Sequence, residues 1–218
     1  MDNLDDIVEK IRASFEARNK ARDQALAVCR LLTRHCAHAI RAVHRQEIDA
    51  ADTHLLEAAK LAAQLYDSLS MYPELYYAGY TQDALKEYSE ATITRALILN
   101  LPLPSPKQIG VEDATWLNGL AEVTGELRRR CMDILRQGYS SEAERLLACM
   151  DDIYSVLVTI DYPDAITNGL RRHTDLVRGI VERTRGDLTI SQREHHLQQA
   201  LAELSIRLDR EGSAHADH

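Results

Sequence analysis

The sequence Lys-Glu-Tyr-Ser-Glu-Ala at residues 86–91, together with Ala-Glu-Val-Thr-Gly-Glu-Leu at residues 121–127, decides the fold. We expect the first stretch to lie in a helix over residues 81–100 and the second in a helix over residues 112–137. Each stretch carries two glutamates three or four residues apart, so each pair shares one helix face. The connection between the helices is short and proline-rich, which predicts that they fold back as antiparallel neighbours.

The glutamates in these stretches are Glu87, Glu90, Glu122 and Glu126. If the two faces meet, four carboxylates converge in a space where their charges repel one another unless a cation neutralises them. Clustered carboxylate oxygens are hard ligands that suit Mg²⁺ or Mn²⁺. The alternative is a solvated helix surface, because glutamates at this spacing also recur by chance.

Small residues beside the glutamates favour close packing of the two faces. Gly119 and Gly125 flank Glu122 inside the predicted helix, where each glycine costs about 1 kcal/mol relative to alanine. Such glycines mark the close approach of another helix or of a ligand. Ala91 and Ala121 also sit next to a glutamate, one on each helix. Close packing of two acid-bearing faces indicates a cation between them.

The remainder of the chain has the composition of an all-α protein, rich in Ala, Leu, Glu, Arg and Gln. Apolar residues at helical spacing predict seven helices and no strand. Besides the two helices above, the predicted helices cover residues 5–45, 48–69, 140–160, 163–185 and 191–208. We expect one domain over residues 1–210 and a disordered tail over residues 211–218.

The first predicted helix, residues 5–45, is far longer than an average globular helix and would extend beyond a small bundle. We therefore expect a partner to cover its far end. The aromatic connector over residues 71–80 is too apolar to remain exposed. Both features predict a homo-oligomer, and we expect an octamer.

The bulk properties of the chain exclude several classes of protein. The formal net charge of −8 argues against nucleic-acid binding by the whole surface, but it is compatible with a local basic patch. The N-terminus is acidic, and no apolar run approaches the ~20 residues of a membrane span. Four cysteines without a metal-binding or disulfide pattern are typical of buried thiols in a reducing compartment: Cys29, Cys36, Cys131 and Cys149. We expect a soluble, cytoplasmic protein with no membrane partner.

A stripe of basic residues follows one face of the first predicted helix. It consists of Arg30, Arg34, His38, Arg41 and Arg45, and no acidic residue interrupts the sequence between positions 24 and 46. A solvated face normally mixes both signs of charge. The stripe therefore indicates a track for phosphates, with an ordinary surface or an inter-helix salt-bridge face as the alternative.

The two glutamate stretches, with Phe-Glu-Ala-Arg-Asn-Lys at residues 15–20 and Ile-Arg-Ala-Val-His-Arg at residues 40–45, resemble the translin and translin-associated factor X family. The resemblance covers residues 4–208 and is closer to the factor X branch and its single-gene prokaryotic relatives. One departure is Glu122, where the factor X pattern has aspartate.

This resemblance implies an all-α subunit that assembles into a hollow octameric barrel around single-stranded nucleic acid. In the factor X branch, inward carboxylates bind Mg²⁺ and cleave RNA. The resemblance also implies that basic residues of the first helix, which include His44, line the interior.

We therefore expect a protein that binds single-stranded RNA or DNA and acts as a Mg²⁺-dependent endoribonuclease. Its candidate ligands are Glu87, Glu90 and Glu122, with Glu126 as a fourth ligand or as the base that orients the attacking water. Arg129, one turn beyond Glu126, is the candidate for a phosphate contact.

Three alternatives remain open. The first is an all-α, Mg²⁺-dependent nucleotide pyrophosphohydrolase, whose second motif is normally Glu-x-x-Asp, whereas this chain has Glu122-x-x-x-Glu126. The second is a ferritin-like di-iron protein, which is disfavoured because Glu-x-x-His is absent from the sequence. The third is a non-catalytic scaffold that binds nucleic acid.

Overall fold

The computed structural model describes residues 3–216, and the side chains of residues 3–208. All regular structure in this part of the chain is helical, so the predicted all-α class is confirmed. The long helices are α1 (Leu4–His44), α2 (Ile48–Ser68), α4 (Gly79–Ile98), α6 (Asp113–Leu135), α7 (Ser141–Leu157) and α9 (Leu170–Ala216). One-turn helices lie in the connections: α3 (Pro73–Tyr76), α5 (Pro106–Ile109) and α8 (Asp164–Thr167).

The last two predicted helices are one continuous helix. We expected Gly186-Asp187 to end a helix that starts at Pro163, but α9 passes through both residues without interruption. A single glycine costs a helix only about 1 kcal/mol, and Asp187 is held by an ion pair to Arg128 of α6 at 2.8 Å. The helix begins at Leu170 instead, after two residues with positive φ angles (52° and 80°) at positions 168 and 169.

The C-terminal tail also differs from the prediction. The α9 helix continues to Ala216, so residues 211–216 are helical where the sequence predicts disorder. Residues 217–218, the remainder of that predicted tail, lie outside the described residues.

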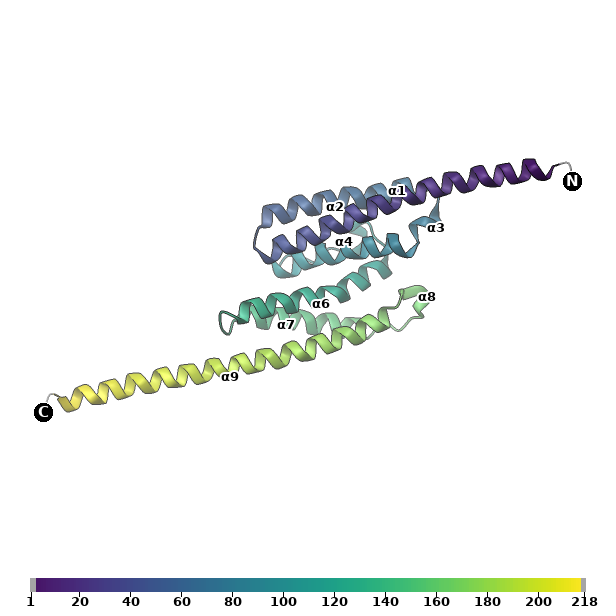
Figure 1. Cartoon of the computed structure of the whole chain (residues 1–218). Coiled ribbons are helices and arrows are strands. Elements are labelled where there is room, and N and C mark those ends of the chain that lie inside the picture. The colour runs from purple at the N-terminus through teal and green to yellow at the C-terminus, as the bar shows by residue number, and fades with distance from the viewer. Residues whose placement is uncertain (1–2, 217–218) are drawn as a thin grey trace.

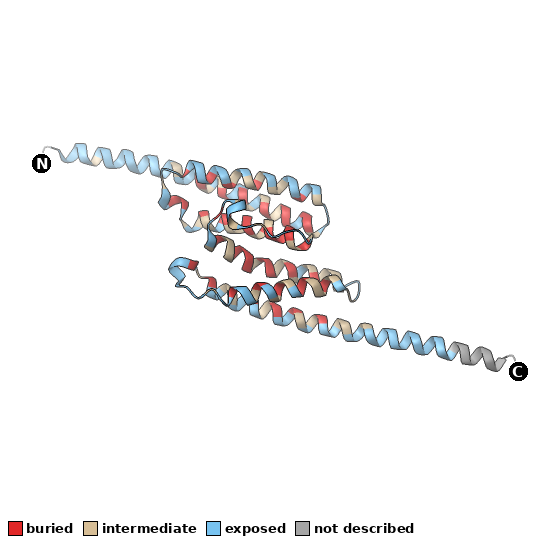
Figure 2. Ribbon diagram, turned by 180° about the vertical axis from the view of Figure 1, so that it is seen from behind, coloured by how far each residue is buried: buried red, intermediate tan, exposed pale blue. Residues whose placement is uncertain are grey.

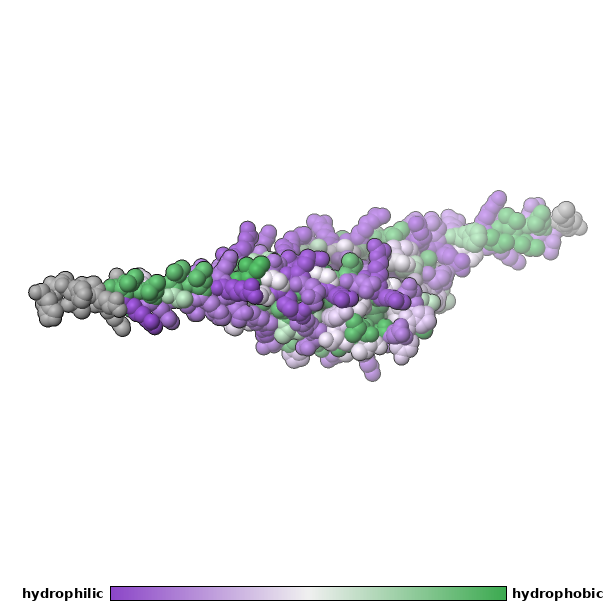
Figure 3. Space-filling view, turned by 90° about the horizontal axis from the view of Figure 1, so that it is seen from below, coloured by the Kyte–Doolittle hydropathy of each residue, from purple (hydrophilic) through white to green (hydrophobic). Residues whose placement is uncertain are grey.

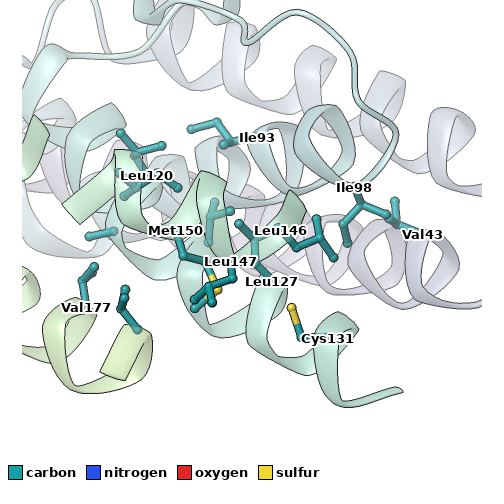
Figure 4. Packing of buried hydrophobic residues seen from close by; sticks show 14 of the residues in the cluster. Val43, Ile93, Ile98, Leu120, Leu127, Cys131, Leu146, Leu147, Met150 and Val177 are labelled. Atoms are coloured by element: carbon teal, nitrogen blue, oxygen red, sulfur yellow. The ribbon is translucent and has the colours of Figure 1, made fainter. Parts of the chain in front are cut away.

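The helices are stacked in layers, with α1 and α2 at one side, then α4, then α6, and finally α7 and α9 (Figure 1). Two hydrophobic clusters hold the layers together. One lies between α1, α2 and α4, and the other joins α6, α7 and α9 to the ends of α1 and α4 (Figure 4). Buried residues are concentrated on α4 and α6, which occupy the middle of the stack (Figure 2).

The α4 and α6 helices are parallel, and the predicted antiparallel arrangement is wrong. Thr115 near the start of α6 donates a hydrogen bond to Gln82 near the start of α4, and Glu122 pairs with Lys86 one turn further along α4 and two turns further along α6. The connection covers residues 99–112, which at roughly 3.3 Å per residue can reach about 45 Å. That exceeds the length of α4, about 30 Å, so the chain can return to the starting end before α6 begins.

The connection is fixed to the outside of the bundle rather than left free. The indole of Trp116 donates a hydrogen bond to the Pro104 carbonyl at 2.9 Å. Ser105 and Gln108 form a reciprocal capping box at the start of α5, with Pro106 as its first residue. Prolines and caps therefore stabilise an extended return path rather than a tight turn.

Two helices extend far beyond the stack, at opposite ends of the molecule (Figure 1). The first turns of α1 and residues 196–208 of α9 are almost entirely exposed (Figure 2), which confirms that the first helix overhangs the bundle. Both extensions carry apolar residues at helical spacing, visible as green patches in Figure 3: Leu4, Ile7, Ile11 and Phe15 on α1, and Ile190, Leu197, Leu201, Leu204 and Leu208 on α9. Across residues 3–216, none of the helices combines the length and the apolar character that a membrane crossing needs.

These exposed stripes predict self-association, because side chains such as Leu201 (57% exposed) gain about 1.5–3 kcal/mol each when fully buried. Light scattering at micromolar concentration should give a mass well above the 24.6 kDa of one chain. The double substitution Leu197→Glu, Leu201→Glu should lower that mass, whereas Gln198→Glu, Gln199→Glu on the same turns should leave it unchanged. A stable monomer of the unaltered protein would contradict the prediction.

Candidate functional site

Three of the four predicted site glutamates converge where α4 crosses α6. Glu87 and Glu90 of α4 and Glu122 of α6 each place one carboxylate oxygen within 4.8 Å of the other two. All three side chains are half-buried, so their charges are only partly screened by solvent. No other group of three or more histidine, cysteine or acidic side chains in the described residues comes together this closely.

The fourth glutamate lies beside this group and is paired with a histidine. The imidazole Nε2 of His44, at the end of α1, donates to Glu126 Oε2 at 2.5 Å, and the His44 side chain is only 4% exposed. Arg129 also contacts Glu126, with 3.5 Å between the guanidinium and the same oxygen. Sequence reasoning placed His44 among the nucleic-acid-binding residues, which stays a prediction, and the structure shows its side chain buried against Glu126.

Lys86 supplies a second cation at the site. Its ammonium group lies 2.7 Å from Glu122 Oε1, and its side chain is 19% exposed. Sequence reasoning missed this contact, although Lys86 is adjacent to Glu87 in the stretch that it singled out. Because α4 and α6 are parallel, Lys86 faces Glu122 rather than solvent.

Gly119 makes the close crossing of α4 and α6 possible. A Cβ at this position would lie 2.6 Å from the Ser89 Cβ, closer than such atoms approach, and would make a tight contact of 3.0 Å with the Lys86 carbonyl oxygen. The prediction that Gly119 marks the close approach of another helix is therefore confirmed. For Gly125 that prediction is wrong, because nothing lies within 4 Å of its would-be Cβ. The alternative, close approach of a ligand at Gly125, stays a prediction.

The glutamates of the group repel one another. Burial, followed by the charges of the neighbouring carboxylates, raises the pKa of Glu90 to about 8. Burial and the charge of Glu122 also raise the pKa of Glu87. By contrast, the hydrogen bond from His44 lowers the pKa of Glu126 and outweighs its burial. Glu126 is therefore ionised at neutral pH, whereas Glu90 retains a proton until a cation or a higher pH removes it.

A thiol lies close to the group on the α1 side. Cys36 is fully buried, and its burial, with the charges of Glu87 and Glu90, raises the pKa of the thiol. Sequence reasoning predicted buried cysteines, and Cys29 and Cys131 are buried as well, whereas Cys149 is half-buried. The spacing of apolar residues along the first helix was the signal from which the orientation of Cys36 toward α4 could have been predicted.

The predicted basic stripe lies on the exposed face of α1. Arg30, Arg34, Arg41 and Arg45 are exposed, and the Arg41 guanidinium lies 3.0 Å from His38 Nδ1. In the described part of the chain, none of these four arginines has a carboxylate within ion-pair distance. The stripe is therefore a surface of uncompensated positive charge next to the face that carries His44.

Comparison with known proteins places this arrangement in a family. No family model matches the chain. The chain is 31% identical over 196 residues to uncharacterized protein MJ0175 of Methanocaldococcus jannaschii. The matched region covers 89% of this chain and 86% of that protein. Among solved structures it resembles AfC3PO, with 31% identity, a TM-score of 0.79, and coverage of 86% of this chain and 97% of that one.

Two further structures are similar. AfC3PO in a complex with duplex RNA has a TM-score of 0.78, with 30% identity over 86% of this chain and 97% of that one. The apo form of NeC3PO has a TM-score of 0.77 and 21% identity over 84% of this chain and 96% of that one, which shows the shared fold. The fold is therefore that of the C3PO structures, and the protein is all-α. The chain belongs to the translin and translin-associated factor X family.

Gly119→Ala should separate α4 from α6 and disturb the glutamates, because the new methyl group meets backbone atoms of α4 that cannot move aside. We expect a net loss of about 1–3 kcal/mol in the free energy of unfolding, despite the better helix propensity of alanine. Gly125→Ala is the matched control, with open space at its Cβ, and should be neutral or stabilising by up to about 1 kcal/mol. Thermal denaturation of both variants measures this, and equal melting temperatures would contradict the close crossing.

The raised pKa of Glu90 predicts a pH-dependent stability of the metal-free protein. The folded state keeps a proton on Glu90 up to about pH 8, whereas the unfolded chain loses it near the ordinary value of 4.5. The stabilisation is therefore present at low pH and is lost as the pH rises through about 8. Glu90→Gln removes the titrating group, so its stability relative to the unaltered protein should increase between about pH 5 and about pH 8.

Chemical denaturation in EDTA gives this difference at each pH. Glu57→Gln on α2 is a suitable control, because a hydrogen bond from Lys60 lowers the pKa of Glu57 and keeps it ionised across the window. If the difference in unfolding free energy between Glu90→Gln and the unaltered protein stays constant over this pH range, the repulsion between the carboxylates that the structure indicates is absent.

Proposed function

We propose that this protein binds RNA and cleaves it internally as a Mg²⁺-dependent endoribonuclease. The observation that carries the proposal is the convergence of Glu87, Glu90 and Glu122 within 4.8 Å, beside a fourth glutamate that His44 holds in place. Family membership supports it, because AfC3PO has been solved in a complex with duplex RNA. We further propose that copies of the chain associate into a hollow barrel, which would bury the apolar extensions of α1 and α9.

The residues present fit a divalent cation. Three carboxylate oxygens within 4.8 Å are a hard donor set of the kind that Mg²⁺ and Mn²⁺ prefer. The pKa of Glu90, raised to about 8 by burial and by its acidic neighbours, indicates that the group lacks enough positive charge of its own. Lys86 neutralises only Glu122. Glu87, Glu90 and Glu122 would hold the ion.

When bound, Mg²⁺ would supply a water of lowered pKa and would neutralise charge on the scissile phosphate. Residues of the chain itself would orient the attacking water and contact the phosphate. Glu126 is ionised and fixed by His44, so it can accept a hydrogen bond from the attacking water and orient it. Arg129 is half-exposed at the edge of the group, where its guanidinium can reach a phosphate.

Binding of the strand itself is assigned to the arginines of α1. Arg30, Arg34 and Arg41 are exposed and have no acidic partner in the described residues, so they can contact phosphates without breaking ion pairs. We expect single-stranded RNA or DNA to bind along this stripe with a steep dependence on salt. Because AfC3PO was solved with a duplex, the binding of single-stranded and of duplex RNA should both be measured for this chain.

Cleavage of a single-stranded RNA tests the nuclease directly. The unaltered protein should cleave with Mg²⁺ and not with EDTA, and Glu90→Ala and Glu122→Ala should each lose at least about a hundredfold in rate. RNA binding should persist in both variants, because neither residue belongs to the stripe. Glu57→Ala on α2 removes an acidic side chain outside the group and should cleave normally.

Thermal stability gives a second readout that does not depend on activity. Mg²⁺ should raise the melting temperature of the unaltered protein, by an amount that corresponds to about 2.7 kcal/mol at a hundred times the dissociation constant. Both glutamate variants should lose this shift. Cleavage that survives EDTA or either substitution would leave a binding protein, and hydrolysis of free nucleoside triphosphates instead of RNA would indicate a pyrophosphohydrolase.

A further inference from the structure

A second site lies beside the carboxylate group, at the end of the molecule where α1 and α6 both finish. It is a cavity of about 420 Å³ between the turn after α1 and the last turns of α6. The α1 side contributes His44, Arg45 and Gln46, and the α6 side contributes Arg130, Asp133 and Arg136. The volume is within the range of small-ligand sites, at the lower end.

The charge of the cavity is opposite to that of the chain as a whole. Three arginines line it against one aspartate, in a protein with a formal net charge of −8. Asp133 is paired with Arg136, with 3.8 Å between their charged groups. Neither Arg45 nor Arg130 has a carboxylate within 4.0 Å in the described part of the chain. Two guanidinium groups are therefore available to an anion.

Two nitrogens on residues of the cavity have no hydrogen-bond partner within the described chain. They are Nδ1 of His44 and Nε of Arg130, and both atoms are buried. Buried polar atoms without a partner are rare in folded proteins, and each requires an explanation such as a bound group. The His44 side chain is 4% exposed, and its other ring nitrogen holds Glu126. One buried imidazole thus joins the cavity to the carboxylate group.

We propose that this cavity binds a phosphate group of the RNA strand, held by Arg45 and Arg130. This inference rests on the proposed function and extends it to the recognition of the substrate. Guanidinium groups match the geometry of phosphate oxygens with paired hydrogen bonds, which makes arginine the residue suited to such a site. The cavity assigns a role to Arg130, the neighbour of the Arg129 that sequence reasoning chose for a phosphate contact.

A phosphate in this cavity would fix the strand at a set distance from the glutamates. The phosphate could be an internal phosphodiester next to the cleaved one, or the terminal phosphate of a strand end. Both present the same charged oxygens to Arg45 and Arg130, so the experiment must tell them apart.

The test measures binding of RNA in EDTA, where no cleavage occurs. Two RNAs of one sequence, one with a 5′-phosphate and one with a 5′-hydroxyl, are titrated against the unaltered protein, Arg130→Gln and the double variant Arg45→Gln, Arg130→Gln. Arg178→Gln removes an exposed arginine of α9 and is the matched control for the loss of one charge. Melting temperatures in phosphate-free buffer show whether each variant is folded.

We expect Arg130→Gln to weaken RNA binding about tenfold and to reduce the slope of log K against log salt by about 0.7, the contribution of one phosphate contact. If the cavity takes a strand end, the unaltered protein prefers the 5′-phosphorylated RNA and the variants lose that preference. If the cavity takes an internal phosphate, the variants bind both RNAs more weakly than the unaltered protein does, and by the same factor. Either pattern supports the site.

The proposal would be overturned if both cavity variants had affinities and salt slopes within about twofold of those of Arg178→Gln. Inorganic phosphate is a probe that is independent of RNA, and it should raise the melting temperature of the unaltered protein more than that of Arg130→Gln. Cleavage with Mg²⁺ is measured separately on the same proteins. RNA binding that follows the expected pattern without any cleavage would retain the phosphate site and reject the nuclease.

Discussion

The close crossing of α4 and α6 is the constraint on which the rest of the structure depends. At Gly119 the two backbones approach so closely that even a methyl group does not fit. This contact places the Glu122 face of α6 directly against the Glu87 and Glu90 face of α4. It also puts both helices in the middle of the stack, where they pack against α1 on one side and α7 and α9 on the other. A residue with any side chain at position 119 would force the layers apart and disperse the carboxylates.

The crossing creates an electrostatic problem that the chain resolves only in part. Glu126 accepts a hydrogen bond from His44 and pairs with Arg129, and Glu122 pairs with Lys86, so two of the four carboxylates have a cation of their own. Glu87 and Glu90 do not, and burial with like charge raises the pKa of both. A protein selected for stability alone would replace such residues, because buried like charges are destabilising. This arrangement supports the proposal that the glutamates are a ligand set for an external cation.

Sequence reasoning predicted the all-α class, the overhang of the first helix and the shared faces of the glutamate pairs, because each follows from helical periodicity alone. It was wrong where the answer depends on the path of the chain. The proline-rich connection suggested a tight turn, but α4 and α6 are parallel because residues 99–112 span the whole helix length. Gly186 suggested a helix end, but the ion pair of the adjacent Asp187 with Arg128 comes from a different helix and has no local signature. The contact of His44 with Glu126 joins residues 82 positions apart, so spacing along one helix could not reveal it.

The parallel arrangement has a further effect, which the antiparallel one would not produce. Because α1 and α6 run in the same direction, their C-terminal ends lie side by side and bring His44, Arg45, Arg130 and Arg136 around one cavity. Cations are favourable at helix C-termini, where the backbone dipoles leave partial negative charge, so Arg45 and Arg136, the C-cap residues of α1 and α6, are stabilised there before any ligand arrives. The acidic residues Glu87 and Glu90 of α4 and Glu122 of α6 lie in the middle of their helices, away from these ends. The arginines of the cavity and the glutamates are therefore separated along the direction of the helices, and His44 lies between the two groups.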